Sequence, residues 1–198
     1  MKIKVQIIVE SDSGKTALVQ DVAHLDRTTL RPEALGLTLA EAKALLQNVQ
    51  QTIVEQQTAE YLEQQSACPQ CGKQRLHKGE HTIVYRTLFG KLRLHSPRLF
   101  HCPCQPHSTR TFSPLVELLV ERTAPELLYL EAKFASLVSY GMSMQLFEEV
   151  LPIGEEINAT TIRNHTLRVA ERVESELGSE QMFFIEGCER DWAATAPA

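Results

Sequence analysis

Two cysteine pairs separated by thirty residues constrain this chain more than any other feature. The first pair is Cys68 and Cys71, followed at once by Gly72, and the second is Cys102 and Cys104. A Cys-x2-Cys turn points two thiolates at one ion, and the glycine permits the backbone reversal. Four sulfur ligands make the closed tetrahedral site of a structural zinc ion. We therefore predict one structural zinc held by these four cysteines.

The ligand from the second pair stays open. A Cys-x-Cys spacing is tighter than usual, and His101 and His107 each lie three residues from Cys104. Either histidine could replace a thiolate, because zinc also accepts imidazole nitrogen. The alternatives to a metal site are a redox pair or buried thiols without a ligand. A hairpin between the pairs argues against both.

The residues between the pairs predict short antiparallel strands. Polar and apolar residues alternate over 81–88, as in a half-buried strand, and again over 92–96. Phe89-Gly90-Lys91 supply the turn, where Gly90 can take positive φ. The face expected to be buried carries Ile83, Tyr85 and Thr87. Two or three short strands are not stable alone in water and need a cross-link such as a bound metal ion. We therefore predict a zinc β-ribbon over residues 67–110.

The charge of this ribbon differs from that of the remaining chain. Residues 73–110 contain eight Lys or Arg, one acid and five of the seven histidines, whereas the whole chain has 20 basic and 25 acidic residues. A basic module in an acidic protein predicts a polyanionic partner, most plausibly nucleic acid. The plain alternative is a ribbon whose charges only keep it soluble. The residues predicted to contact phosphates are Lys78, Arg86, Lys91, Arg93 and Arg98.

The segment before the ribbon, residues 1–66, predicts a β-hairpin and a long helix. Residues 2–10 and 16–24 have the composition of strands, with a turn between them. Thr38 and Glu41 form a capping-box pattern, and no Gly or Pro follows until after Ser66. The apolar stripe expected on this helix is Leu39, Ala42, Leu45, Leu46, Val49, Ile53 and Val54. The helix either packs on the hairpin or pairs with its copy in a dimer.

The segment after the ribbon, residues 111–178, predicts helices in the order of a helix-turn-helix. One helix begins at Pro125 and ends at Tyr140-Gly141, a short one covers 143–150, and Asn158 caps a third that runs to Leu177. On the third helix, polar side chains recur at intervals of three or four. Such groups near a helix N-terminus contact base edges in the major groove. The residues predicted to do so are Thr161, Asn164 and Arg168. A plain helical bundle would look similar.

Composition and missing motifs exclude several classes of function. No run of eighteen apolar residues exists, so no membrane span is expected, and the N-terminus lacks the block structure of a signal peptide. We expect an intracellular, cytoplasmic protein, and in that compartment paired cysteines more often hold metal than form disulfides. No phosphate-binding loop, nucleophile elbow or His-Glu-x-x-His is present. A complete small enzyme is therefore the weakest interpretation.

Several segments together resemble ISKra-type transposases of bacterial insertion sequences. The resemblance covers essentially the whole chain and is most specific in the ribbon, with its Thr-Leu-Phe-Gly turn. The segments that carry it are residues 67–73, 77–81, 86–93, 96–104, 122–130 and 158–165. It implies that the chain is similar to the N-terminal half of these enzymes, which is thought to bind the terminal repeats of the element.

The resemblance does not extend to catalysis. In the family, an RNase H-like domain with a carboxylate triad on two metal ions cuts and joins DNA, and its first strand should begin shortly after a segment like residues 189–192. This chain stops at Ala198, and Asp191 precedes that strand, so we assign no catalytic residue. We expect residues 179–198 to be a tail leading to a catalytic domain that is missing or separately encoded.

The sequence thus predicts an α+β protein: an N-terminal β-hairpin and long helix, a zinc β-ribbon, and a helix-turn-helix-like segment. The expected function is binding to double-stranded DNA at transposon ends, without strand transfer by this chain alone. The possible protein partners are a second copy of this chain or a separately encoded catalytic domain. No membrane partner is expected. The alternative is a zinc-stabilised protein-interaction or regulatory module that does not touch DNA.

Overall fold

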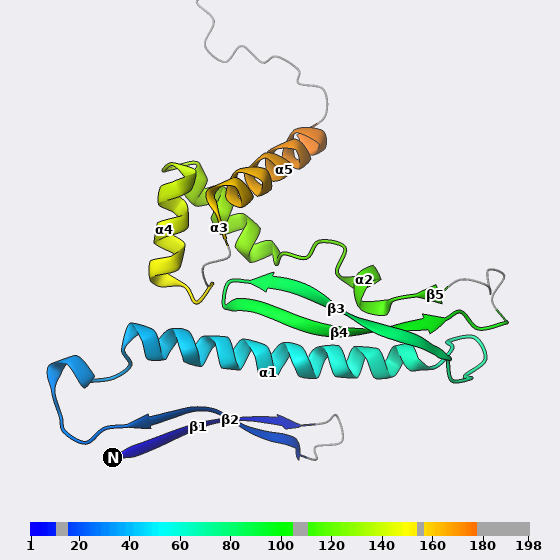
Figure 1. Cartoon of the computed structure of the whole chain (residues 1–198), viewed down its shortest axis with the longest axis horizontal. Coiled ribbons are helices and arrows are strands. Elements are labelled where there is room, and N and C mark those ends of the chain that lie inside the picture. The colour runs from blue at the N-terminus through cyan, green and yellow to red at the C-terminus, as the bar shows by residue number, and fades with distance from the viewer. Residues whose placement is uncertain (11–15, 105–110, 154–156, 178–198) are drawn as a thin grey trace, which may run out of the picture.

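The structure is a computed structural model that describes residues 1–10, 16–104, 111–153 and 157–177. Two small antiparallel sheets and five α-helices make up this part of the chain, which confirms the α+β class (Figure 1). The first sheet pairs β1 (Lys2–Glu10) with β2 (Thr16–Asp26), and the second has the order β3 (His77–Thr87), β4 (Gly90–Phe100), β5 (Thr111–Phe112). The helices are α1 (Leu39–Ser66), α2 (Pro114–Leu118), α3 (Pro125–Ala135), α4 (Tyr140–Val150) and α5 (Ala159–Leu177).

The long helix α1 lies between the two sheets, as Figure 1 shows. It packs on β2 on one side and on β4 and α2 on another, so it packs on its own chain, as one of the two alternatives predicted. The predicted apolar stripe is confirmed only in part. Val54 packs against the core of the ribbon, and Ala42, Leu45 and Val49 are half-buried. The one fully buried side chain of α1 is Thr52, whereas Leu46 and Ile53 are each 42% exposed. Because the helix meets neighbours on more than one side, its apolar contacts are spread around it.

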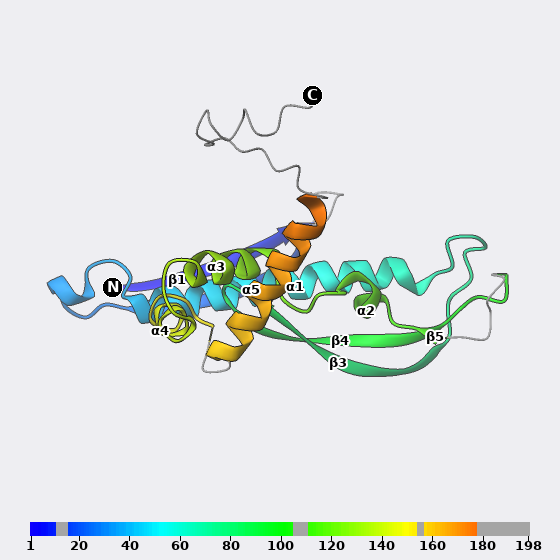
Figure 2. The same ribbon diagram turned by 90° about the horizontal axis from the view of Figure 1, so that it is seen from above.

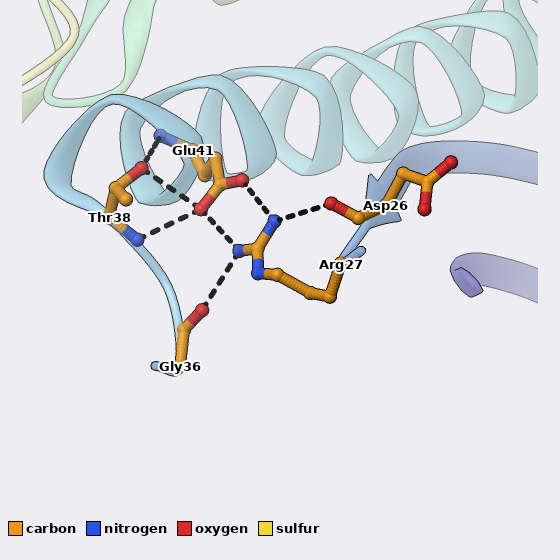
Figure 3. A network of polar contacts seen from close by, with 5 residues as sticks. All are labelled: Asp26, Arg27, Gly36, Thr38 and Glu41. Carbon is orange, nitrogen blue, oxygen red and sulfur yellow. Dashed lines mark hydrogen bonds and ion pairs between the residues drawn. The ribbon is translucent and has the colours of Figure 1, made fainter. Parts of the chain in front are cut away.

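A polar network fixes the start of α1 to the end of β2 (Figure 3). The predicted capping box is present: the Glu41 N–H donates to Thr38 Oγ1 at 3.3 Å, and the Thr38 N–H donates to Glu41 Oε2 at 2.9 Å. The Arg27 guanidinium donates to both oxygens of the same carboxylate, at 2.7 and 2.8 Å, and also to the Gly36 carbonyl. The Arg27 hydrogen bonds lower the pKa of Glu41 to about 2.

The strands between the two cysteine pairs are longer than predicted. The two main strands, β3 and β4, each have eleven residues, and β4 continues through Pro97 instead of splitting there. Proline is tolerated because β5 pairs only with Leu99 and Phe100, which leaves that edge of β4 open at Pro97. The predicted inner face is confirmed for Ile83 and Thr87, which are buried, and Tyr85 is half-buried. This face of the ribbon packs against α1 and α2 around a core of Ile83, Leu92, Leu94 and Leu115.

The turn of the ribbon differs slightly from the prediction. β3 ends at Thr87 and β4 begins at Gly90, so Leu88 and Phe89 form the loop and Gly90 is already paired with Thr87. Gly90 does have positive φ, at 122°. A Cβ there would lie 3.2 Å from Gln47 of α1 and 3.4 Å from the Pro152 carbonyl. The turn is therefore held between α1 and the segment that follows α4.

The helical segment forms one packed unit, but two of its predicted boundaries were wrong. α3 ends at Ala135 and α4 already begins at Tyr140, so Gly141 lies inside a helix and does not end one. The local cause is Ser139, whose Oγ accepts the Met142 N–H at 3.3 Å and caps α4. Leu137 and Val138 lie in the connection between the two helices and are exposed. The third helix and its Asn158 cap are confirmed, since the Thr161 N–H donates to Asn158 Oδ1 at 2.8 Å.

The unit formed by α3, α4 and α5 has internal contacts and is also joined to the ribbon. Its three helices share a core that includes Leu127, Phe147 and Ile162. Between α3 and α5, the Glu131 carboxylate is fully buried, and its Oε2 lies 2.5 Å from the His165 ring. The unit joins the ribbon through the backbone: the Arg86 N–H donates to the Arg122 carbonyl and the Ala124 N–H to the Arg86 carbonyl. Seen from above, α3, α4 and α5 lie towards the end of the molecule where α1 begins, and α2 lies towards the other end of α1 (Figure 2).

None of the helices described is both long and apolar enough to span a bilayer.

Candidate metal centre

The four predicted cysteines converge at one end of the ribbon. All four sulfur atoms lie within 4.8 Å of one another. The shortest separations are 3.4 Å between Cys71 and Cys102 and 3.5 Å between Cys68 and Cys104. Zinc bound tetrahedrally at about 2.3 Å from each sulfur requires sulfur atoms roughly 3.8 Å apart. The observed separations, from 3.4 Å to at most 4.8 Å, lie on both sides of this value, so the donor set fits a zinc ion after small adjustments.

The backbone places the first two thiols. The Cys68 N–H donates to the Lys73 carbonyl, and the Gly72 N–H donates back to the Cys68 carbonyl at 2.8 Å, which closes a tight loop. Gly72 has φ of 71°, the positive value expected for a glycine after a Cys-x2-Cys turn. Antiparallel bridging of Ala67 with Gln74 completes this loop. Without that reversal the two thiols could not face one ion.

The second pair arrives from the end of β4. The Phe100 N–H donates to the Leu76 carbonyl, which brings the chain next to the first loop just before Cys102. Cys102 is buried, as is Cys68, while Cys71 and Cys104 are exposed. Cys104 also donates to Gln70 Oε1 at 3.6 Å. The site therefore has an inner and an outer thiol from each pair.

Two of the thiols, Cys68 and Cys104, have shifted pKa values. Backbone N–H groups of Cys71 and then Gln70 lower the pKa of Cys68 to about 6. The neighbouring sulfurs, first Cys102 and then Cys68, raise the pKa of Cys104 to about 12. Crowded thiols disfavour further negative charge, and a divalent cation reverses that effect by stabilising the thiolates.

His101 and His107 were the alternative ligands predicted for the second cysteine pair. The His101 ring stacks on Phe112, with ring centroids 4.7 Å apart, and His101 is not part of the four-residue cluster. The Arg75 guanidinium lies over the same Phe112 ring, at 4.7 Å from its centroid. Phe112 belongs to β5, so these contacts hold β5 beside the cysteine loops. His107 lies outside the described residues.

The basic residues predicted to contact phosphates are distributed along the ribbon. Arg86 and Lys91 oppose each other near the turn and are half-buried, whereas Arg93 is exposed in the middle of β4. Lys78 and Arg98 are exposed towards the cysteine end, where Lys78 Nζ lies 5.9 Å from the Phe100 ring centroid. His95, which the prediction did not include, is also exposed on β4. Its alternation with the buried Leu94 and Ser96 was the signal that could have identified it.

The predicted base-contacting residues lie on α5. Asn164 and Arg168 are exposed, while Thr161 is half-buried and its hydroxyl donates to Asn158 Oδ1. Arg163, which the prediction did not include, is also exposed on this helix. Ile157, just before α5, lines a small crevice together with Arg86 and Lys91. The start of α5 therefore lies beside the turn end of the ribbon.

Comparisons with known proteins gave no match: no family model, no curated protein and no solved structure is significantly similar to this chain.

Proposed function

We propose that this protein binds one zinc ion through Cys68, Cys71, Cys102 and Cys104, and uses the resulting ribbon and the α3–α5 unit to bind double-stranded DNA. The observation that carries the proposal is the meeting of four thiols at the end of a basic ribbon. The resemblance to ISKra-type transposases adds a specific ligand, the terminal repeats of an insertion sequence. In this proposal β3, β4 and the cysteine loops form a zinc ribbon, and α4 and α5 act as the helix-turn-helix.

The dimensions of the ribbon support this assignment. Strands of eleven residues are about 35 Å long, which is close to one turn of duplex DNA. Over this length, Arg93 and Arg98 are exposed on β4, with Lys78 on β3. The ribbon can therefore follow a phosphate backbone through spaced single charges. Such contacts position a protein on DNA without reading its sequence.

The position of α5 supports a second role. Its N-terminal end lies beside the turn of the ribbon, and Asn164 and Arg168 project their polar groups to solvent. Asn and Arg make bidentate contacts with adenine and guanine edges in the major groove. In this arrangement the ribbon supplies affinity and α5 supplies specificity.

Salt dependence of DNA binding tests the ribbon. Each phosphate contact releases counterions, so log affinity falls with log salt at a slope of about −0.9 per contact. Replacing both Arg93 and Arg98 by Gln should flatten that slope by up to about two units on every sequence. Arg31→Gln, an exposed substitution between β2 and α1 and outside both proposed DNA-binding parts, is the matched control and should leave the slope unchanged. Fluorescence anisotropy at several salt concentrations measures both.

Specificity tests α5. Asn164→Ala should cost roughly 1–3 kcal/mol on the terminal repeat and little on random duplex, with the salt slope preserved. The zinc-loaded chain and the flanking terminal repeats of its own element are the reagents. If the zinc-loaded chain binds neither repeat nor random duplex, and shows no salt dependence, DNA binding is wrong. The protein-interaction module would then be the better description.

A further inference from the structure

The N-terminal hairpin carries an unused pairing edge. In the described part of the chain, β1 pairs only with β2, and the two strands form a sheet of their own. Helix α1 covers β2, where Val22 is 3% exposed and its carbonyl accepts a hydrogen bond from Asn48. The apolar residues of β1 on that side, Val5, Ile7 and Val9, remain half-exposed, and Ile3 is exposed. A two-stranded sheet is marginal in water, and an open edge with apolar neighbours favours addition of another strand.

The two edges of this hairpin are not equivalent. Both register shifts between the strands place the additional residue on β2, at Val22 and at Ala17, so β2 is irregular. By contrast, β1 runs through nine residues without a bulge, glycine or proline. Bulges protect an edge against pairing, and β1 lacks that protection. The strand that can accept a partner is therefore β1.

The sequence of β1 is complementary to itself. When two copies of β1 run antiparallel with Gln6 opposite Gln6, all nine residues pair, and Lys2 of each copy lies opposite Glu10 of the other. The same register sets Ile3 opposite Val9 and Val5 opposite Ile7. Opposite charges and β-branched residues in directly facing positions stabilise a sheet. Within the described residues, the ion pair that β1 makes in its own hairpin uses Lys4 with Asp21, and not Lys2 or Glu10.

We infer that β1 is a dimerisation edge that binds β1 of a second copy of this chain, giving a continuous four-stranded antiparallel sheet. A two-fold axis perpendicular to that sheet places the half-exposed Val5, Ile7 and Val9 of both copies on one face, between the two α1 helices. Two equal strands related in this way form an isologous contact that closes as a dimer. This inference rests on the hairpin and does not depend on DNA binding.

Site-directed cross-linking tests both the contact and its register. Facing residues of antiparallel strands have Cα atoms about 4.5–5.5 Å apart, which is within disulfide reach. Gln6→Cys should therefore form a disulfide-linked dimer on mild oxidation of the zinc-loaded chain. Ile8→Cys, exposed on the same strand, is the matched control. Its two copies would lie roughly 14 Å apart in this register and should not cross-link. Equal cross-linking of both variants, or of neither, overturns the inference.

Charge reversal provides a second test that needs no new cysteine. Lys2→Glu and Glu10→Lys each place like charges opposite one another twice, and each should weaken self-association by about ten-fold in analytical ultracentrifugation. An equimolar mixture of the two variants should restore association, because the mixed pair has complementary charges. Lys133→Glu, on α3, should have no effect. A wild-type chain that stays monomeric at every concentration, or a mixture no tighter than either variant alone, overturns the inference.

Discussion

At the scale of single residues, the four cysteines are the groups that can hold the two loops at one end of the ribbon together. Two of them are buried and two are exposed, yet all four sulfur atoms lie within 4.8 Å. The neighbouring sulfur atoms disfavour the anionic form of Cys104, whose pKa is raised. A zinc ion bound among the four sulfur atoms would remove that penalty and would hold both loops together.

Replacing a first-pair cysteine should release the metal. We expect about one zinc per chain in the wild type and none retained by Cys68→Ser or Cys71→Ser, because three ligands do not close a structural site. His101→Ala should keep its zinc, since His101 stacks on Phe112 and is not part of the cluster. Elemental analysis after gel filtration measures the stoichiometry. Full zinc content in both cysteine variants would contradict the site.

The Arg27–Glu41 pair should make stability depend on pH in acid. The pKa of Glu41 falls from 4.5 to about 2 on folding, so its stabilising contribution is complete above about pH 4.5 and is lost as the pH falls towards 2. Glu41→Gln can still form the capping box but loses the charge that faces Arg27. Urea midpoints of the two proteins should differ most near neutral pH and converge near pH 2–3. A constant difference across that range would contradict the assignment.

At the scale of elements, the turn of the ribbon connects three parts of the molecule. Gly90 lies against Gln47 of α1 and the carbonyl of Pro152, and the adjacent Arg86 backbone is bonded to Arg122 and Ala124. The two-residue loop between β3 and β4 is thus packed on both sides. A change in this turn should affect α1 and the helical unit together.

Two glycine substitutions should have opposite effects on stability. Gly90→Ala should destabilise the fold by about 1–3 kcal/mol, because alanine rarely adopts φ of 122° and its Cβ would be close to backbone oxygen. Gly141→Ala in α4 meets nothing within 4 Å and should stabilise by up to about 1 kcal/mol. Chemical denaturation of both variants measures the difference. Equal shifts in the same direction would show that the packing at Gly90 is not as described.

At the scale of the whole molecule, α1 is the element on which the other parts assemble. It contacts the N-terminal hairpin through β2 and the ribbon through β4 and α2. The ribbon therefore has a packed core of its own, with Ile83 and Leu92 beneath α1 and α2, in addition to any metal. This arrangement changes what loss of zinc should do.

Removal of zinc should loosen only the cysteine end of the ribbon. We expect chelation to increase hydrogen exchange in residues 67–76 and 100–104, while the centre of β3 and β4 and the α3–α5 unit stay protected, because apolar packing holds them. Hydrogen exchange with mass spectrometry before and after chelation measures this directly. Exchange that rises uniformly across 67–104 would mean that the metal holds the whole ribbon.

The sequence by itself determined the local features of this protein. The capping box at Thr38, the strand alternation around Ile83 and the Cys-x2-Cys-Gly turn each depend on residues a few positions apart, and each was predicted correctly. The boundary between α3 and α4 was predicted wrongly although its cause is local. Gly141 suggests the end of a helix, whereas the Ser139 side chain caps the start of the next one.

Only the tertiary structure decided how these pieces meet. The spacing of the cysteines left the fourth ligand open, and the pairing of β3 with β4 brought Cys102 and Cys104 to the first pair while His101 stacked on Phe112. The buried side of α1 could not be deduced either, since a helix packed between two sheets has no single apolar stripe. Contacts between residues far apart in the chain depend on which surfaces remain to be covered after each element has formed, and that information is distributed over the whole molecule.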